Sequence, residues 1–156
     1  MKERRGFVSN SSSSSFVVIP ENYQPKVNED YGKLAMAFAF SVCDDWNGIF
    51  IDGEHAFDWQ VKQYHDFESK WNWLVLQAFY GGQKYMEIIN NFLSSTTSNR
   101  VKVNWNGVED ADNNCYAYID HQSVDPKCTF DEVARIGIGN FLLDSNCYIQ
   151  NGNDNE

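Results

Sequence analysis

The chain has 156 residues, of which 42% are hydrophobic and 15% aromatic, and its formal net charge is −10. This length fits one domain that buries a substantial core without disulfides or a metal, which excludes extended disorder except at the two ends. An acidic surface repels phosphate, so we expect no direct binding to nucleic acid. A basic protein surface is the complementary partner, although the same charge also fits a soluble acidic protein without one.

The first elements predicted along the chain are short. Residues 16–19 form an apolar string that Pro20 ends, which predicts a strand, and residues 21–30 form a polar loop. The apolar run over residues 34–42 is a buried helix or a buried strand, and its Ala and Met content favours the helix. The turn dipeptides Asn47-Gly48 and Asp52-Gly53 bracket residues 49–51, which predicts a second strand.

Two helices are predicted in the middle of the chain. Residues 67–79 carry an apolar stripe at helical spacing, and Gly81 and Gly82 end this helix. The stripe consists of Trp71, Leu74, Val75 and Ala78. Residues 84–93 have the same spacing, and the polar run over residues 94–99 ends the second helix.

Strands and one more helix are predicted in the last third. Apolar and polar residues alternate over residues 101–105 and 115–119, and these two strands can pair across the acidic loop of residues 107–114. Thr129 can cap a helix with Glu132 three residues on. That helix extends to Phe141, although Gly137 and Gly139 weaken it by ~1 kcal/mol each. Residues 147–149 form the last strand.

Together these elements predict an α+β fold, with a small, mostly antiparallel sheet packed with three or four helices in a single domain. The domain spans residues 16–150. A basic, Ser-rich segment over residues 1–15 precedes it, and a polar tail over residues 151–156 follows it.

The cysteines and the hydropathy of the chain favour a cytoplasmic location. Cys43, Cys115, Cys128 and Cys147 form no C-x-x-C pair and no zinc-like spacing. No apolar run approaches the ~20 residues of a membrane span, and polar residues follow the basic N-terminus where a signal peptide needs an apolar stretch. We therefore expect reduced thiols and no membrane association, with a Cys115–Cys128 disulfide as the alternative in an oxidising compartment.

The N-terminal string GFVSNSSSSSFVV (residues 6–18) follows three basic residues, Lys2, Arg4 and Arg5, and is improbable by chance. It resembles the N-terminus of many uncharacterised proteins from bacteria and their phages. The ending CYIQNGNDNE is similar to the ending of some of them, and YIDHQS (residues 118–123) is similar more weakly. The resemblance implies a bacterial or phage source and brings no catalytic residue, because the group has no established activity.

The serine run offers many local hydrogen bonds and little surface to bury, so in isolation it is flexible. A flexible segment suits recognition, modification or cleavage by a partner. The alternative is an extension that docks along the domain through Phe7, Val8 and Phe16. The candidate binding residues of this segment are Asn10, Ser11, Ser12, Ser13, Ser14, Ser15 and Phe16.

One acidic stretch has a partial calcium motif. Residues 110–114 match the opening D-x-[DN]-x-[DN] of an EF-hand loop through Asp110 and Asp112. The loop requires Gly at its sixth position and Glu at its twelfth, where this chain has Cys115 and His121. A solvated hairpin loop is the better interpretation, and we expect no bound metal.

A nucleophilic site made by Cys115, Asp120 and His121 is the least favoured chemistry. On a straight strand Cys115 and His121 face the same side ~20 Å apart, too far for direct contact. The chain has no P-loop, GxGxxG, GxSxG or HExxH motif, so we predict no cofactor and lean against an enzyme.

Two tryptophans bear on recognition. Trp71 and Trp73 lie two positions apart in the predicted helix, ~200° apart around its axis, so they cannot both face one core. One of them is therefore exposed as an interface anchor, or both are buried between packed layers.

The leading hypothesis is a non-enzymatic interaction protein, derived from a phage or mobile element, that binds a host or defence protein through an acidic and aromatic surface. Its candidate residues are Trp71, Trp73, Asp110, Asp112, Asp120 and His121. The second hypothesis is a substrate or cargo whose Ser-rich segment an enzyme recognises. The third is a small hydrolase or transferase that uses Asp120 and His121.

Overall fold

The computed structural model describes residues 13–24, 31–39, 48–58, 60–120 and 125–153. The strands in this part of the chain are β1 (Ser13–Val18), β2 (Ala56–Phe57), β3 (Lys62–Tyr64), β4 (Tyr118–Ile119) and β5 (Tyr148–Asn153). The helices are α1 (Tyr31–Ala39), α2 (Phe67–Gly81), α3 (Gln83–Thr97), α4 (Trp105–Asn113), α5 (Pro126–Ile136) and α6 (Ile138–Leu143). The predicted α+β fold is confirmed, with six helices among the described residues where three or four were expected.

None of the described helices is long and apolar enough to cross a lipid bilayer.

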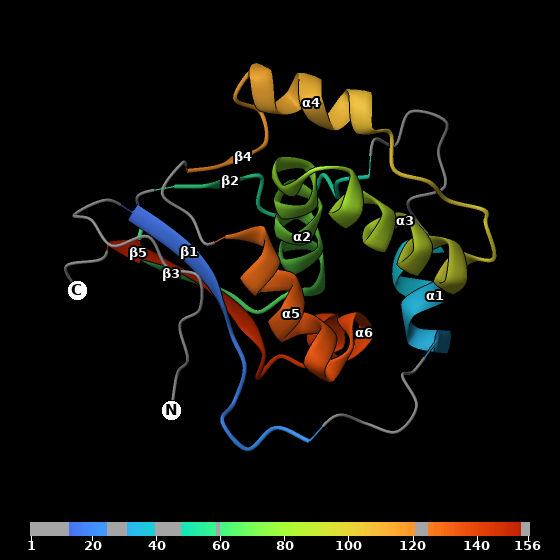
Figure 1. Ribbon diagram of the computed structural model, residues 1–156, viewed down its shortest axis with the longest axis horizontal. Coiled ribbons are helices and arrows are strands. Elements are labelled where there is room, and N and C mark those ends of the chain that lie inside the picture. Colours follow the sequence, from blue (N-terminus) through green and yellow to red (C-terminus); the bar gives the residue numbers. More distant parts are fainter. Residues whose placement is uncertain (1–12, 25–30, 40–47, 59, 121–124, 154–156) are drawn as a thin grey trace.

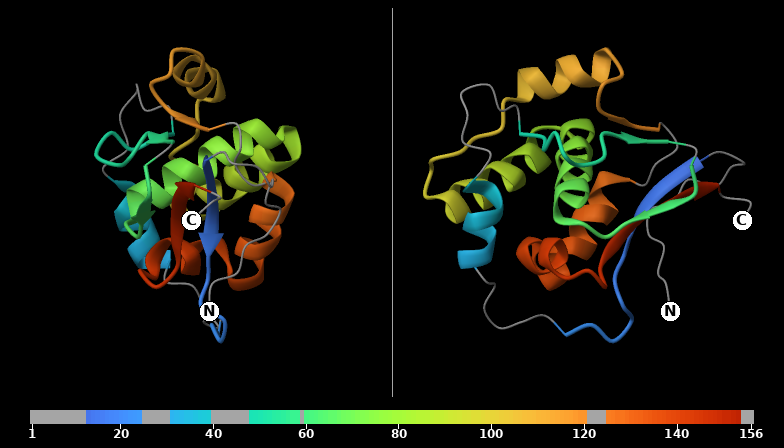
Figure 2. Two further views of the ribbon diagram at one scale, coloured as in Figure 1. Left: turned by 90° about the vertical axis from the view of Figure 1, so that its left-hand side faces the viewer. Right: turned by 180° about the vertical axis from the view of Figure 1, so that it is seen from behind.

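The larger sheet joins the two ends of the chain. Its strand order is β1-β5-β3, and both pairs are antiparallel (Figures 1 and 2). Ser13 pairs with Asn153 and Val18 with Tyr148, so residues 13–15 of the serine run lie beside residues 151–153 of the polar tail. The sheet therefore includes residues 13–15 and 151–153, which the sequence places in the two flanking segments. Strands β2 and β4 form a separate parallel pair, which the sequence pattern did not indicate.

Helix α2 lies at the centre of the molecule (Figure 1). It begins where the Asp66 carboxylate accepts a hydrogen bond from the Ser69 amide at 3.0 Å, and it ends at Gly82, whose φ of 101° suits glycine. Ten consecutive residues, 69–78, are buried, so every face of this helix contacts other elements. An α-helix covered all round acts as the core of the fold.

The two tryptophans of α2 extend in different directions into this core, and both are fully buried. Trp71 packs against Phe38 of α1, with ring centroids 4.8 Å apart, and donates to the carbonyl of Gly48 at 2.7 Å. Trp73 donates to Ser15 Oγ of β1 at 2.9 Å. The prediction that one of them is an exposed interface anchor is wrong, and burial of both is correct.

Three predicted elements differ from the structure in the middle of the chain. Residues 49–51 lie in a bend and a turn and form no strand. Residues 101–104 are irregular, and Trp105 opens α4 because the Asn104 side chain caps its N-terminus, accepting from the Gly107 amide at 3.1 Å. The expected acidic hairpin loop is therefore this helix, and β4 pairs with β2 instead.

The boundaries of two other helices also differ from the prediction. Helix α3 continues through the polar run to Thr97 and ends at Ser98 and Asn99, both at positive φ. Asp125 caps α5, with Pro126 at the first position, whereas Thr129 is buried inside the helix. Gly137, with a φ of 93°, divides the expected single helix into α5 and α6.

A buried lysine holds α2 against the chain segment that leads into β5. Lys70 is fully buried, and its ammonium donates to the carbonyls of Phe141, Asp144 and Cys147 at 2.6, 2.9 and 2.9 Å. An ammonium has three donors, so each one has an acceptor. Burial lowers the pKa of Lys70 to about 8, and the neighbouring Cys147 and Asp144 act in the opposite direction.

We predict that Lys70→Met lowers the free energy of unfolding by about 2–4 kcal/mol, because three carbonyl groups lose the hydrogen bond from Lys70 and the Asp144 carbonyl keeps the one from the Cys147 amide. Lys102→Met is the matched control at an exposed position and should change stability by less than about 0.5 kcal/mol. Urea denaturation at pH 7 measures both. Equal stability of the two variants would contradict a structural role for Lys70.

The difference in the free energy of unfolding between wild type and Lys70→Met should also depend on pH, and the pKa of Lys70 gives the direction of this dependence. Between pH 8 and about 10.5 the unfolded chain retains the Lys70 proton more strongly than the folded chain, so folding becomes more favourable as pH rises. The loss of unfolding free energy in Lys70→Met relative to wild type should therefore grow between pH 8 and about 10.5. The corresponding loss in Lys102→Met should not change with pH. A deficit for Lys70→Met that does not change with pH would show that burial leaves this proton unaffected.

Candidate functional site

Helix α4 and the turn after it form an exposed acidic part of the described chain. Val108 is the one buried residue of α4, and the Trp105 indole fixes the start of the helix by donating to Asn90 Oδ1 at 3.0 Å. In Figure 1 the helix lies across the top of the molecule, above α2 and next to β4. Glu109 and Asp110 are exposed on it.

The turn that ends α4 projects a tyrosine into solvent. Cys115 has a φ of 59°, in the left-handed region, and this reverses the chain. The Tyr116 amide then donates back to the carbonyl of Ala111 at 2.8 Å, which holds Tyr116 beside the last turn of α4. The side chain of Tyr116 is 75% exposed.

Tyr80, at the end of α2, joins three elements at this place. Its hydroxyl donates to Asp112 Oδ1 of α4 at 2.6 Å and accepts from the Ile119 amide of β4 at 2.9 Å. Burial of the hydroxyl and the hydrogen bond to Asp112 raise its pKa well above the ordinary value of 10. The ring is still 38% exposed, so Tyr80 both fixes α4 and contributes to the surface.

We call this region the acidic–tyrosine surface and define it by five residues. They are Tyr80, Glu109, Asp110, Asp112 and Tyr116. Between Lys102 and Lys127 the sequence has five acidic residues and no lysine or arginine, so no basic side chain of this stretch neutralises the carboxylates. Carboxylates beside tyrosine rings match a surface rich in arginine, whose guanidinium binds both.

The structure brings together some of the residues expected from the sequence. Asp110 and Asp112 lie on α4, close to β4, and Asp120 follows β4, where its amide donates to the Phe57 carbonyl at 3.0 Å. Trp71 and Trp73 belong to the core and not to this surface. His121 lies outside the described residues.

Sequence reasoning missed Tyr80 and Tyr116 as surface residues. Tyr116 falls in the alternating pattern of residues 115–119, which indicates a half-buried strand. The signal for its exposure is the Asn113-Asn114 pair just before the turn, since Asn is favoured where a helix ends.

The partial calcium motif lies at the end of α4. The prediction of a hairpin loop there is wrong, because residues 110–113 are helical. Asp112 accepts from Tyr80, and Asn114 Nδ2 donates to the carbonyl of Asp110 at 2.8 Å, so these groups stabilise the helix end. Among the described residues, no three His, Cys, Asp or Glu side chains converge as metal ligands. Cys115 and Cys128 are free thiols, so the alternative disulfide is not formed.

The serine segment is in part a structural strand. Asn10, Ser11 and Ser12 lie outside the described residues, whereas residues 13–16 belong to β1. Ser15 is buried and accepts a hydrogen bond from the Trp73 indole. Its partner in the sheet is Asn151, whose side-chain amide donates to the carbonyls of Asp58 and Gln60. An enzyme could reach Ser15 only after this strand left the sheet.

The chain matches no protein-family model, and neither a curated protein nor a solved structure is significantly similar to it.

We predict that Tyr80→Phe destabilises the protein by about 1 kcal/mol, because the Ile119 amide loses its acceptor and Asp112 loses its donor. The amides of α4 should also exchange with deuterium faster, since the helix loses a link to α2. Tyr116→Phe removes an exposed hydroxyl and should change neither stability nor exchange. If the two variants behave alike, Tyr80 does not hold α4 in place.

Proposed function

We propose that this protein is a non-enzymatic interaction module that binds a basic region of another protein through the acidic–tyrosine surface. The observation that carries the proposal is Tyr116, a large ring that is 75% exposed at the end of an acidic helix. Exposed tyrosines are enriched at protein interfaces because a rigid ring supplies contact area at a low entropic cost.

The two kinds of side chain have separate roles in this proposal. The carboxylates of Glu109 and Asp110 attract a basic partner and raise the association rate. The rings of Tyr116 and Tyr80 then stack on arginine or apolar side chains, and this contact supplies most of the affinity. Salt should therefore slow association more than it speeds dissociation.

A phage or mobile-element origin and a host or defence protein as partner are parts of the same proposal. Their support is the resemblance of the N-terminal string to proteins of bacteria and their phages. We also propose that the partner is met in the cytoplasm, where exposed thiols such as Cys115 persist in the reduced state.

We predict that the double variant Asp110→Lys and Tyr116→Ala lowers capture of the partner by at least about tenfold, because it removes both kinds of contact. The measurement is quantitative affinity capture from the native host with tagged protein, followed by titration of the purified partner. The matched control is Asp52→Lys with Ile51→Ala, which makes the same charge change and removes another exposed side chain outside this surface.

Loss of one protein from the first variant, with its retention by wild type and by the control, is the expected result. If every captured protein is retained equally by both variants, the acidic–tyrosine surface is not the binding site.

A further inference from the structure

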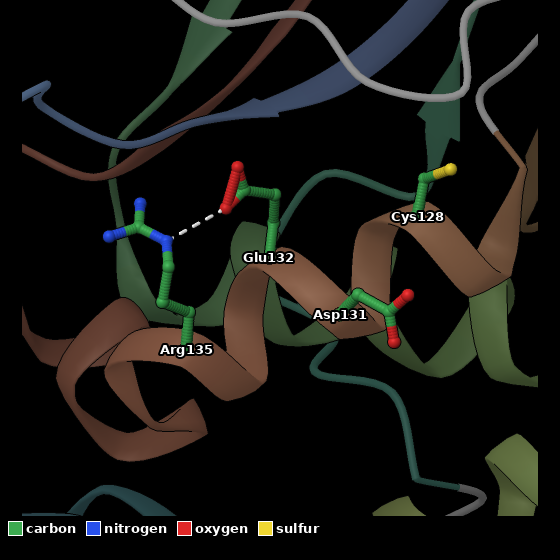
Figure 3. Close-up of a pocket in the computed structure, with 4 residues that line it drawn as sticks. All are labelled: Cys128, Asp131, Glu132 and Arg135. Carbon is green, nitrogen blue, oxygen red and sulfur yellow. Dashed lines mark hydrogen bonds and ion pairs between the residues drawn. The ribbon is translucent and has the colours of Figure 1, made fainter.

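A polar pocket on α5 is already occupied by ion pairs of its own helix. It measures about 270 Å³ and is lined by Cys128, Asp131, Glu132 and Arg135 (Figure 3). Glu132 pairs with Arg135 at 3.0 Å, and Asp131 pairs with Lys127 at 2.9 Å. A ligand at this place would have to displace these ion pairs, so we assign none to it.

A second pocket lies just beyond the paired ends of β1 and β5. Val18 ends β1 and pairs with Tyr148, which begins β5, so the two strands meet the loops of the pocket at the same end. The pocket measures about 550 Å³, and small-molecule sites in proteins measure roughly 300–1,000 Å³. We call it the turn pocket, and its lining residues are Pro20, Glu21, Asn22, Tyr23 and Asn146.

Hydrogen bonds close both turns that form the walls of the turn pocket. In the first turn the Tyr23 amide donates to the carbonyl of Pro20 at 3.0 Å. In the second turn the Cys147 amide donates to the carbonyl of Asp144 at 3.0 Å, and the same carbonyl accepts from Lys70 at 2.9 Å. Walls that are fixed before a ligand arrives lower the entropic cost of binding.

Tyr23 connects the two turns and supplies the aromatic wall. Its ring is half-buried and packs against the main core, which holds it in place. Burial of the hydroxyl raises the pKa of Tyr23 to about 12, with further contributions from Cys147 and Asp144 of the second turn. The side chain therefore extends from the first turn to the second and stays protonated at neutral pH.

Two asparagine side chains offer hydrogen bonds in the turn pocket, one from each turn. Asn22 and Asn146 are exposed, and their side-chain amides form no hydrogen bond with another residue of the described chain. Each amide has two donor hydrogens and one acceptor oxygen. Among the described residues, no lysine, arginine or histidine lines the pocket. A ligand that fits has closely spaced donors and acceptors, an apolar face for the tyrosine ring and no negative charge.

We propose that the turn pocket binds a neutral saccharide. Each hydroxyl of a sugar both donates and accepts hydrogen bonds, which matches the two side-chain amides. The C–H face of a pyranose ring packs on Tyr23 as other apolar groups pack on aromatic rings. The Asp144 carboxylate beside Tyr23 and the net charge of −10 disfavour phosphorylated and carboxylated sugars.

Saccharide binding is a function separate from the binding of a basic protein. The turn pocket and the acidic–tyrosine surface have no residue in common, so the chain can hold both ligands at once. Either proposal can fail without the other.

Saturation-transfer NMR on the full chain tests the proposal with five neutral probes and one acid. The neutral probes are glucose, galactose, mannose, N-acetylglucosamine and N-acetylgalactosamine, and the acid is glucuronic acid. We expect transfer to at least one neutral sugar, with a Kd of about 1 mM as suits an open pocket, and no transfer to glucuronic acid.

Single alanine variants locate the site. Asn22→Ala and Asn146→Ala should each weaken binding of that sugar roughly five- to tenfold, because each removes hydrogen bonds to its hydroxyls. Neither residue has a positive φ, so alanine fits the backbone and both variants should fold. The matched control is Asn106→Ala, at an exposed position of α4, which should bind with wild-type affinity.

Three results would overturn the proposal. Absence of transfer to all five neutral sugars would show that the turn pocket is not a saccharide site. Equal transfer to glucuronic acid would contradict the selection against negative charge. Wild-type affinity in both Asn22→Ala and Asn146→Ala would place the bound sugar elsewhere on the protein.

Discussion

The structure depends on one buried cation. Lys70 points from the central helix α2 to three carbonyl groups, one in α6 and two in the segment that joins α6 to β5, and donates to each of them. These carbonyls lie where a helix ends and the chain turns, and the Asp144 carbonyl also accepts from the Cys147 amide of the same segment. The ammonium thereby sets the position of β5, and β5 in turn is the middle strand on which β1 and β3 are paired.

A central helix that is buried all round leaves no room for function on itself. The tryptophans of α2 join β1 and α1 to the core, so the largest aromatic side chains serve folding. Tyr80, in the last turn of α2, reaches the surface and there forms hydrogen bonds with α4 and β4. The surface that we propose for recognition therefore lies on α4, which packs against α2 and has a mostly exposed, acidic face.

Much of this fold could be predicted because its signals are local. The helical spacing of residues 67–79, the end of that helix at the glycine pair and a strand near residue 148 were predicted correctly, although β5 continues to Asn153 through residues assigned to the polar tail. The role of Lys70 could not be predicted, since a lysine in a helix is normally a solvent-facing residue. Residues 101–105 alternate like a strand, but the Asn104 cap starts a helix there, and alternation does not detect a cap. The sequence could not decide between burial of both tryptophans and exposure of one, because only the tertiary contacts show that α2 is enclosed on every side.

The most direct test of partner binding through the acidic–tyrosine surface is site-specific photo-crosslinking in the native host. In this experiment p-benzoylphenylalanine replaces Tyr116. The same residue in place of Met36, 71% exposed on α1, is the control. We expect position 116 to crosslink one protein with a basic surface, and position 36 to crosslink none. Crosslinking of that protein from position 36 and not from position 116 would contradict recognition by the acidic–tyrosine surface.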